Sequence, residues 1–342
     1  MKSVKAIGSY LMIIGLAAAF FFSGSVAMAA GKTYTLTAGF GSPPDFLVPY
    51  YYMKIFKEKV EDYSQGELKI KLFHSGSLCS ETGCVEQMQQ GALDIAELST
   101  ENYSAFHDTF LVYDLPYLFK NREHARRAAL GVVFDLLKEK SEEKDKVKCL
   151  GIASTYGFRN LYQNAREVRV PADMKGLKIR VTQSPIPALL TKGWGAAALN
   201  VPWPEVYQAA QTKVIHGNWQ PTGWMYASKL YEVMDYCTEM GPTYNFIIFV
   251  MSLKKYNSLP RHLQLILDQA AKESNEEIWE YDKAEAKKYK AKLQELGVKY
   301  YTPTSAEMEL WRTPGLKVLE KFKSMVDPQI FQLIESMGKN IK

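Results

Sequence analysis

The sequence predicts an α/β protein with two domains. Residues 34–38 and 68–73 alternate apolar and polar side chains like strands, and residues 49–64 between them place Phe56 and Val60 on one face of a helix. The chain has 342 residues, of which 47% are hydrophobic and 13% aromatic. At the usual domain size of roughly 100 to 200 residues, such a chain fills two cores, and its composition argues against disorder.

The next segments continue this alternation. Residues 86–91 are predicted to form a helix that ends at Gly91, and residues 93–98 a strand that leaves it. A helix is expected over residues 122–138 and a buried strand over residues 147–153.

Glu97 and Ser99 lie at the end of the strand predicted at 93–98. Ligands of open α/β sheets bind beyond the carboxyl ends of strands, so both residues are candidate ligand contacts. A solvated strand end is the alternative interpretation of Glu97.

The second half carries the same two patterns. Residues 177–181 alternate after a turn and predict a strand, and helices are expected at 184–192, after a serine cap, and at 205–212. A short strand is predicted at 214–215, and a longer one at 244–253, where β-branched and aromatic residues are dense.

A long helix is predicted over residues 260–296, because apolar residues recur at helical spacing opposite a charged face, without an internal proline or glycine. A final strand at 298–301 and helices up to residue 342 are expected after it.

Residues 1–29 have the features of a signal peptide. Lys2 and Lys5 precede an apolar run at 11–22, which is shorter than the ~20 residues of a membrane-spanning helix, and small residues end at Ala29. We expect cleavage after Ala29 and export to the periplasm.

The charge pattern excludes an obvious nucleic-acid stripe. The formal net charge is +5, but lysines and acidic residues are interspersed, which is typical of a solvated surface, and the weak basic excess favours anionic solutes. In an oxidising compartment Cys79 and Cys84 are expected to form a disulfide, with two free thiols as the alternative. Cys149 is expected to be a small buried residue.

No enzyme motif stands out. GWGAAA at residues 193–198 fits the looser dinucleotide fingerprint, but it follows a predicted helix instead of joining a strand to a helix. The histidines show no metal-ligand spacing, and no nucleophile elbow occurs. We therefore expect no cofactor, no metal and no catalytic residue.

Two arginines, Arg159 and Arg180, stand among apolar residues. A buried guanidinium requires a partner, and its planar fork matches a carboxylate through two parallel hydrogen bonds. The partner is either an internal acid such as Asp173 or Glu205, or the carboxylate of a ligand. We favour the ligand for both arginines.

Ordered motifs across nearly all of the mature chain give the sequence a family resemblance. They are GALD at residues 91–94, DMKGLKIRV at 173–181, PEVYQAAQT at 204–212 and KLYEV at 229–233. With them the chain resembles the solute receptors of tripartite ATP-independent periplasmic (TRAP) transporters, in their dicarboxylate-receptor or DctP branch.

The resemblance implies a two-lobed periplasmic binding protein fold of type II, with an inter-lobe cleft, crossing strands and a long helix along both lobes. Lobe I would comprise residues 30–156 plus about 244–285, and lobe II residues 157–243 plus about 286–342.

The resemblance also assigns site residues. Arg180 would form the main salt bridge to the ligand carboxylate, Arg159 would be a second ligand-facing arginine, and Trp203 would be the aromatic residue before the EVY helix. Gln220 falls where many members have an asparagine, with Asn218 nearby as a second donor to ligand oxygens. Their segment, HGNWQP at residues 216–221, departs from the common DGQENP-like pattern, which leaves the ligand open.

The tryptophans near these residues have two interpretations each, because aromatic side chains both cover ligands and fill cores. For Trp219 the two are level, and for Trp224 the core is favoured.

The resemblance implies a receptor that captures a small organic acid by cleft closure and delivers it to the TRAP membrane permease, and we expect a monomer. The cluster of aromatic residues suggests an aromatic or apolar part in the ligand. A sensor receptor and an exported enzyme are the alternatives.

Overall fold

The structure is a computed structural model that describes residues 32–44, 48–339 and 341. The signal peptide expected at residues 1–29 lies outside this part. From Thr33 onward the chain forms one compact unit.

The first sheet has the strand order β2-β1-β3-β10-β4. Its strands are β1 (Tyr34–Gly39), β2 (Leu68–Phe73), β3 (Ile95–Ser99), β4 (Val147–Phe158) and β10 (Tyr244–Ser252). β1 lies parallel to β2 and β3, whereas β10 lies antiparallel between β3 and β4. The helices α1 (Val48–Tyr63) and α2 (Glu81–Gln90) connect the first three strands, as the alternating sequence predicted. We call this sheet with its helices lobe I.

The second sheet has the order β11-β9-β5-β8-β6-β7. Its strands are β5 (Asn160–Gln163), β6 (Lys178–Val181), β7 (Ala197–Asn200), β8 (Gly217–Gln220), β9 (Tyr236–Thr238) and β11 (Lys299–Tyr301). The helices α6 (Pro185–Gly193), α7 (Val206–Gln211) and α8 (Thr222–Ala227) belong to this part, which we call lobe II. The strand predicted at 214–215 is wrong: Val214 is 49% exposed, and the strand that pairs with β5 and β6 is β8.

The chain passes between the sheets at two strand crossings. β4 leads directly into β5 around Arg159, and β9 is followed by β10 after residues 239–243. The two sheets confirm the predicted two-lobed α/β fold with crossing strands.

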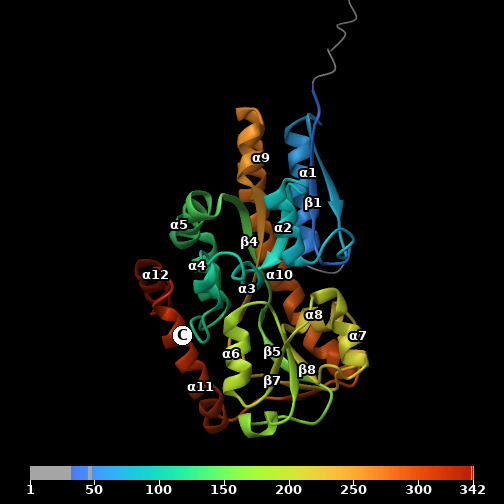
Figure 1. Ribbon diagram of the computed structural model, residues 1–342, viewed down its shortest axis with the longest axis vertical. Coiled ribbons are helices and arrows are strands. Elements are labelled where there is room, and N and C mark those ends of the chain that lie inside the picture. Colours follow the sequence, from blue (N-terminus) through green and yellow to red (C-terminus); the bar gives the residue numbers. More distant parts are fainter. Residues whose placement is uncertain (1–31, 45–47, 340, 342) are drawn as a thin grey trace, which may run out of the picture. The chain divides into compact units, whose positions relative to one another are not determined.

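The helix α10 (Arg261–Glu295) spans both lobes, as predicted (Figure 1). It packs on α1 and β4 in lobe I and on α8 in lobe II. Asp282 connects the middle of α10 to lobe I. Its fully buried carboxylate forms an ion pair with Arg122 and accepts a hydrogen bond from the backbone N–H of Tyr156.

The predicted helix at 122–138 is in fact two helices, α4 (Arg122–Leu130) and α5 (Val132–Lys140), separated by Gly131. Gly131 is extended, and a Cβ atom at this position would lie 2.8 Å from the carbonyl oxygen of Arg127. The break therefore depends on glycine at this position.

The C-terminal helices differ from the expectation that all of residues 286–342 join lobe II. α11 (Ser305–Lys323) packs on α6 of lobe II, but α12 (Pro328–Gly338) packs on α4 and α5 of lobe I (Figure 1). The apolar residues Ile330, Phe331 and Ile334 of α12 are buried. Apart from α10, the segment between α11 and α12 is therefore a third crossing between the lobes.

His124 of α4 supports α12 in its neutral form. Its Nε2 lies 2.7 Å from the carbonyl oxygen of Ile334, and its Nδ1 accepts the backbone N–H of Lys120. Burial lowers the pKa of His124 below its ordinary value, and the nearby cations Lys120 and Arg127 lower it further.

This depressed pKa predicts a pH dependence of stability. The unfolded chain takes up the proton more readily than the folded one, so the contribution of His124 is complete above about pH 6.5 and is lost as the pH falls through and below that value. Between pH 7.5 and pH 5.5, His124→Asn should reduce the slope of the unfolding free energy against pH by up to about 1.4 kcal/mol per pH unit. The melting temperature of the variant should therefore depend less on pH than that of the wild type. Gln332→Ala, at an exposed residue of α12 that does not titrate, should retain the wild-type slope. Equal slopes in all three proteins would contradict the assignment.

Short helices complete the fold: α3 (Thr100–Tyr103) and α9 (Leu253–Ser258). The disulfide between Cys79 and Cys84 is present, and Cys149 is buried in β4, both as expected. Within the described residues, no helix combines the length and apolarity needed to cross a membrane.

Candidate functional site

Arg180 is a buried cation at the carboxyl end of β6. It is 3% exposed, its Nε donates to the carbonyl oxygen of Val201 at 2.9 Å, and its guanidinium lies 5.7 Å from the ring centre of Trp203. In the described part of the chain it forms no ion pair. Loss of hydration on burial lowers the pKa of Arg180 to about 10, more than the carboxylate of Glu81 restores. Such a cation is costly unless an anion joins it.

Arg159, between β4 and β5, has an internal partner. Its Nη2 lies 3.1 Å from Glu101 of α3, and its Nη1 donates to the carbonyl oxygen of Trp219 at 3.1 Å. Glu101 also accepts a hydrogen bond from Thr182 of lobe II. The internal partner is thus Glu101 instead of the suggested Asp173 or Glu205, and this pair connects the two lobes.

Two small cavities of about 20 Å³ each lie beside Arg180, between the lobes. Five of the eight predicted ligand contacts line the first of them: Ser99, Arg159, Arg180, Trp203 and Gln220. A volume of this size holds about one water molecule, so a larger solute needs the lobes to separate.

The other five residues that line the same cavity were not predicted as ligand contacts: Glu81, Thr182, Trp224, Asn245 and Ile247. Trp224 is buried in the core, as expected, and it also stands edge-on to Trp203 at 4.9 Å and forms part of the cavity wall. Three polar atoms of lining residues are buried without a hydrogen-bond partner among the residues that the structure describes: Nε1 of Trp224, Oδ1 of Asn245 and Nε of Arg159. Buried polar atoms are usually hydrogen-bonded, so these atoms fit a polar ligand.

The other three predicted contacts lie outside the cavity wall. The side chain of Trp219 points to the opposite face of β8, where it packs on Trp194 at 5.0 Å and donates to Thr191 at 2.9 Å. Alternation along the strand explains this, since Asn218 and Gln220 share the other face.

Asn218 is in register with Arg180, and within the described part of the chain both polar atoms of its amide are buried without a hydrogen-bond partner. Glu97 is also buried, in β3, and accepts a hydrogen bond from Gly41. Burial, with a smaller effect of Glu81, raises the pKa of Glu97 well above its ordinary value and so favours the neutral form. Glu97 therefore offers Arg180 little negative charge.

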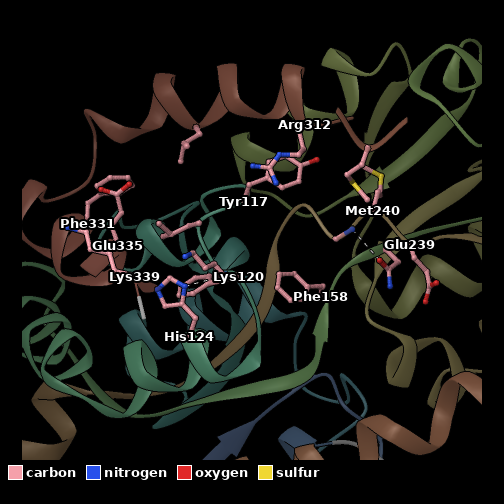
Figure 2. Close-up of a pocket in the computed structure, with 16 residues that line it drawn as sticks. Tyr117, Lys120, His124, Phe158, Glu239, Met240, Arg312, Phe331, Glu335 and Lys339 are labelled. Atoms are coloured by element: carbon pink, nitrogen blue, oxygen red, sulfur yellow. Dashed lines mark hydrogen bonds between the residues drawn. The ribbon is translucent and has the colours of Figure 1, made fainter. Parts of the chain in front are cut away.

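A much larger groove, of about 950 Å³, lies elsewhere (Figure 2). Its wall includes Arg312 of α11, which lies 5.2 Å from the ring centre of Tyr117, together with Phe331 of α12, His124 and Phe158. It is wide and open, and no arginine in its wall is buried. The arginine site between the lobes is therefore the stronger candidate. Among the described residues, no group of three or more His, Cys, Asp or Glu side chains is placed to hold a metal ion.

Two lobes that meet over a buried, unpaired arginine are the arrangement expected of a binding protein for anionic solutes. The chain belongs to the bacterial extracellular solute-binding proteins of family 7 (DctP), whose family model matches residues 48–325. This confirms the family predicted from the motifs.

Individual relatives agree with the assignment. The chain is 28% identical, over 65% of its length and 67% of the relative's, to the 2,3-diketo-L-gulonate-binding periplasmic protein YiaO of Escherichia coli. Its fold matches the sugar acid binding protein DctPAm of Advenella mimigardefordensis in complex with galactonate, with a TM-score of 0.85 and 26% identity over 91% of this chain and 100% of that one. A TRAP periplasmic solute binding protein of Bordetella bronchispeptica, with density assigned to pantoate, matches with a TM-score of 0.82 and 25% identity, over 89% of this chain and 99% of that one.

Proposed function

We propose that this protein is the periplasmic receptor of a TRAP transporter and captures a small organic acid between its lobes. The observation that carries the proposal is Arg180, a buried guanidinium with no carboxylate partner in the described part of the chain. An anionic ligand supplies that partner through a bidentate, charge-assisted pair. The galactonate and 2,3-diketo-L-gulonate named for two relatives are carboxylates of this kind.

Capture requires movement of the lobes. The cavities of about 20 Å³ are too small for such an acid, and their walls come from both lobes: Ser99 and Asn245 from lobe I, Arg180 and Trp203 from lobe II. Hinge rotation at the strand crossings would open the site, and the ligand would favour the closed form through contacts that it makes only there. Exclusion of water on closure strengthens the ion pair.

The closed receptor would then dock on the membrane permease and release the acid. Residues 1–29, with the sequence features of a signal peptide, support delivery to the periplasm. Capture and release of this kind need no covalent step.

A thermal-shift screen of the chain from Ala30 tests this function. The probes are galactonate, gluconate, pantoate and succinate, with uncharged glucose as the control. A ligand that binds only the folded state at 100 times its Kd adds about 2.7 kcal/mol of stability, or about 4 °C for a chain of this length. At least one acid should produce such a shift, and glucose should not. Equal shifts with glucose and the acids, or none with any acid, would overturn the organic-acid function.

A further inference from the structure

The side chain of Glu81 lies in the same site as Arg180, the residue expected to bind the carboxylate of the ligand. Glu81 is the first residue of α2 and lines both small cavities beside Arg180 and Trp203. This position is unusual for an acid-binding site, because a second negative charge next to the arginine disfavours an anionic ligand.

Hydrogen bonds from two lobe I residues fix the Glu81 carboxylate. Its Oε2 accepts from the backbone N–H of Ser99 at 2.9 Å, from Oγ of Ser99 at 3.1 Å and from Nδ2 of Asn102 at 2.7 Å. All three donors go to the same oxygen. Oε1 receives no hydrogen bond from the residues that the structure describes, and it remains available as an acceptor.

The other charges of the site do not cancel Glu81. Arg159 is already paired with Glu101, and Glu101 receives a further hydrogen bond from Thr182. Glu81 and Arg180 thus provide one acceptor and one cation that both border the same small space.

Arg180 and Glu81 require different chemical groups on the ligand. The guanidinium of Arg180 requires a carboxylate, and the free oxygen of Glu81 requires an O–H or N–H donor. A second carboxylate next to Glu81 would face a like charge in a water-poor space, whereas a hydroxyl or ammonium group would donate to it.

We propose that Glu81 makes this receptor selective for monocarboxylates that carry a hydroxyl or ammonium donor, and selects against dicarboxylates. The inference rests on the proposed function and narrows its ligand class. Glu81 acts as a specificity residue, because it rejects one class of acid by repulsion and accepts the other by a hydrogen bond.

Calorimetric titration with matched ligands tests the inference. One pair is 4-hydroxybutanoate and succinate, and the other is gluconate and glucarate; in each pair a terminal CH₂OH becomes a carboxylate. 4-Aminobutanoate adds the ammonium donor. In at least one pair, the wild-type protein should bind the hydroxy acid about tenfold or more tightly than the diacid.

The variant Glu81→Gln removes the charge but keeps an acceptor oxygen for Ser99 and Asn102. This variant should bind the diacid more tightly than the wild type does. In the pair that shows the preference, the affinity for the hydroxy acid should then exceed that for the diacid by about threefold or less. The matched control Glu86→Gln changes an exposed residue of the same helix and should leave the ratio as in the wild type. Comparison of 4-hydroxybutanoate with 4-aminobutanoate shows which donor the site prefers.

Two failures are distinguishable. If the wild-type protein binds the diacids as tightly as their partners, or if Glu81→Gln leaves the ratio unchanged, the role of Glu81 is overturned while acid capture stands. If no carboxylate binds the wild-type protein, the organic-acid function falls, and the inference falls with it.

Discussion

Replacing Arg180 with methionine should weaken the binding of a carboxylate ligand by about 30-fold or more. Truncating one partner of a buried, hydrogen-bonded charge pair costs about 2 to 5 kcal/mol, because the ligand carboxylate would enter the site without its cation. Without ligand, however, the melting temperature of Arg180→Met should be equal to that of the wild type or higher. Arg180 has no carboxylate partner in the described part, and burial lowers its pKa to about 10, so a hydrophobic residue suits the free site at least as well.

Calorimetry with the tightest acid of the screen and thermal melts of the free proteins separate these two effects. Arg180→Lys should also bind weakly, since an ammonium group lacks the bidentate geometry. Lys178→Ala, at an exposed position of the same strand, is the control and should bind like the wild type. A lower melting temperature with unchanged affinity in Arg180→Met would show that Arg180 is a structural residue.

Replacing Asp282 with alanine should produce the largest loss of stability. Asp282 is fully buried in α10, where it pairs with Arg122 and accepts the backbone N–H of Tyr156. Its removal leaves the partly buried guanidinium of Arg122 without its anion, with neutral partners such as Ser154 and the carbonyl oxygen of Trp279. It also removes the acceptor of the Tyr156 backbone N–H. The cost should be about 3 kcal/mol or more. For a chain of this length, that corresponds to a fall of about 5 °C or more in melting temperature.

The variant Asp282→Asn should fall between alanine and the wild type, because the amide oxygen still accepts from Tyr156. Lys283→Ala changes the next, exposed residue of α10 and should shift the melting temperature by about 1 °C or less. Equal effects at positions 282 and 283 would mean that the ion pair does not anchor α10.

Much of the fold is predictable from local pattern. The strand predicted at 68–73 is β2, and the helix predicted at 260–296 differs from α10 by one residue at each end. Both have clear periodicity. β5 and β9 were not predicted. They have only four and three residues and owe their conformation to pairing with neighbours, whereas the equally short β6 was predicted because a turn precedes it.

The site was predictable where a residue is unusual for its surroundings. Arg159 and Arg180 stand out because they are charged residues in apolar segments. Glu81 does not stand out in the sequence, because an acidic residue is favourable in the first turn of any helix. Trp224 does not stand out either, because tryptophans are commonly buried in cores. Trp219 shows the opposite error: it neighbours two polar candidates in sequence, but a one-residue step along β8 turns it to the other face.

The third crossing, between α11 and α12, is a suitable position for a label that reports movement of the lobes. Met325 is 52% exposed and lies between α11 on lobe II and α12 on lobe I. The described cysteines are either joined in a disulfide or buried, so a cysteine introduced as Met325→Cys would be the accessible thiol of the described part. A fluorophore attached there sits far in sequence from every predicted ligand contact, at a joint that must bend when the lobes move. The C-terminal helices thus make this receptor suitable for conversion into a reagentless optical sensor for its own solute.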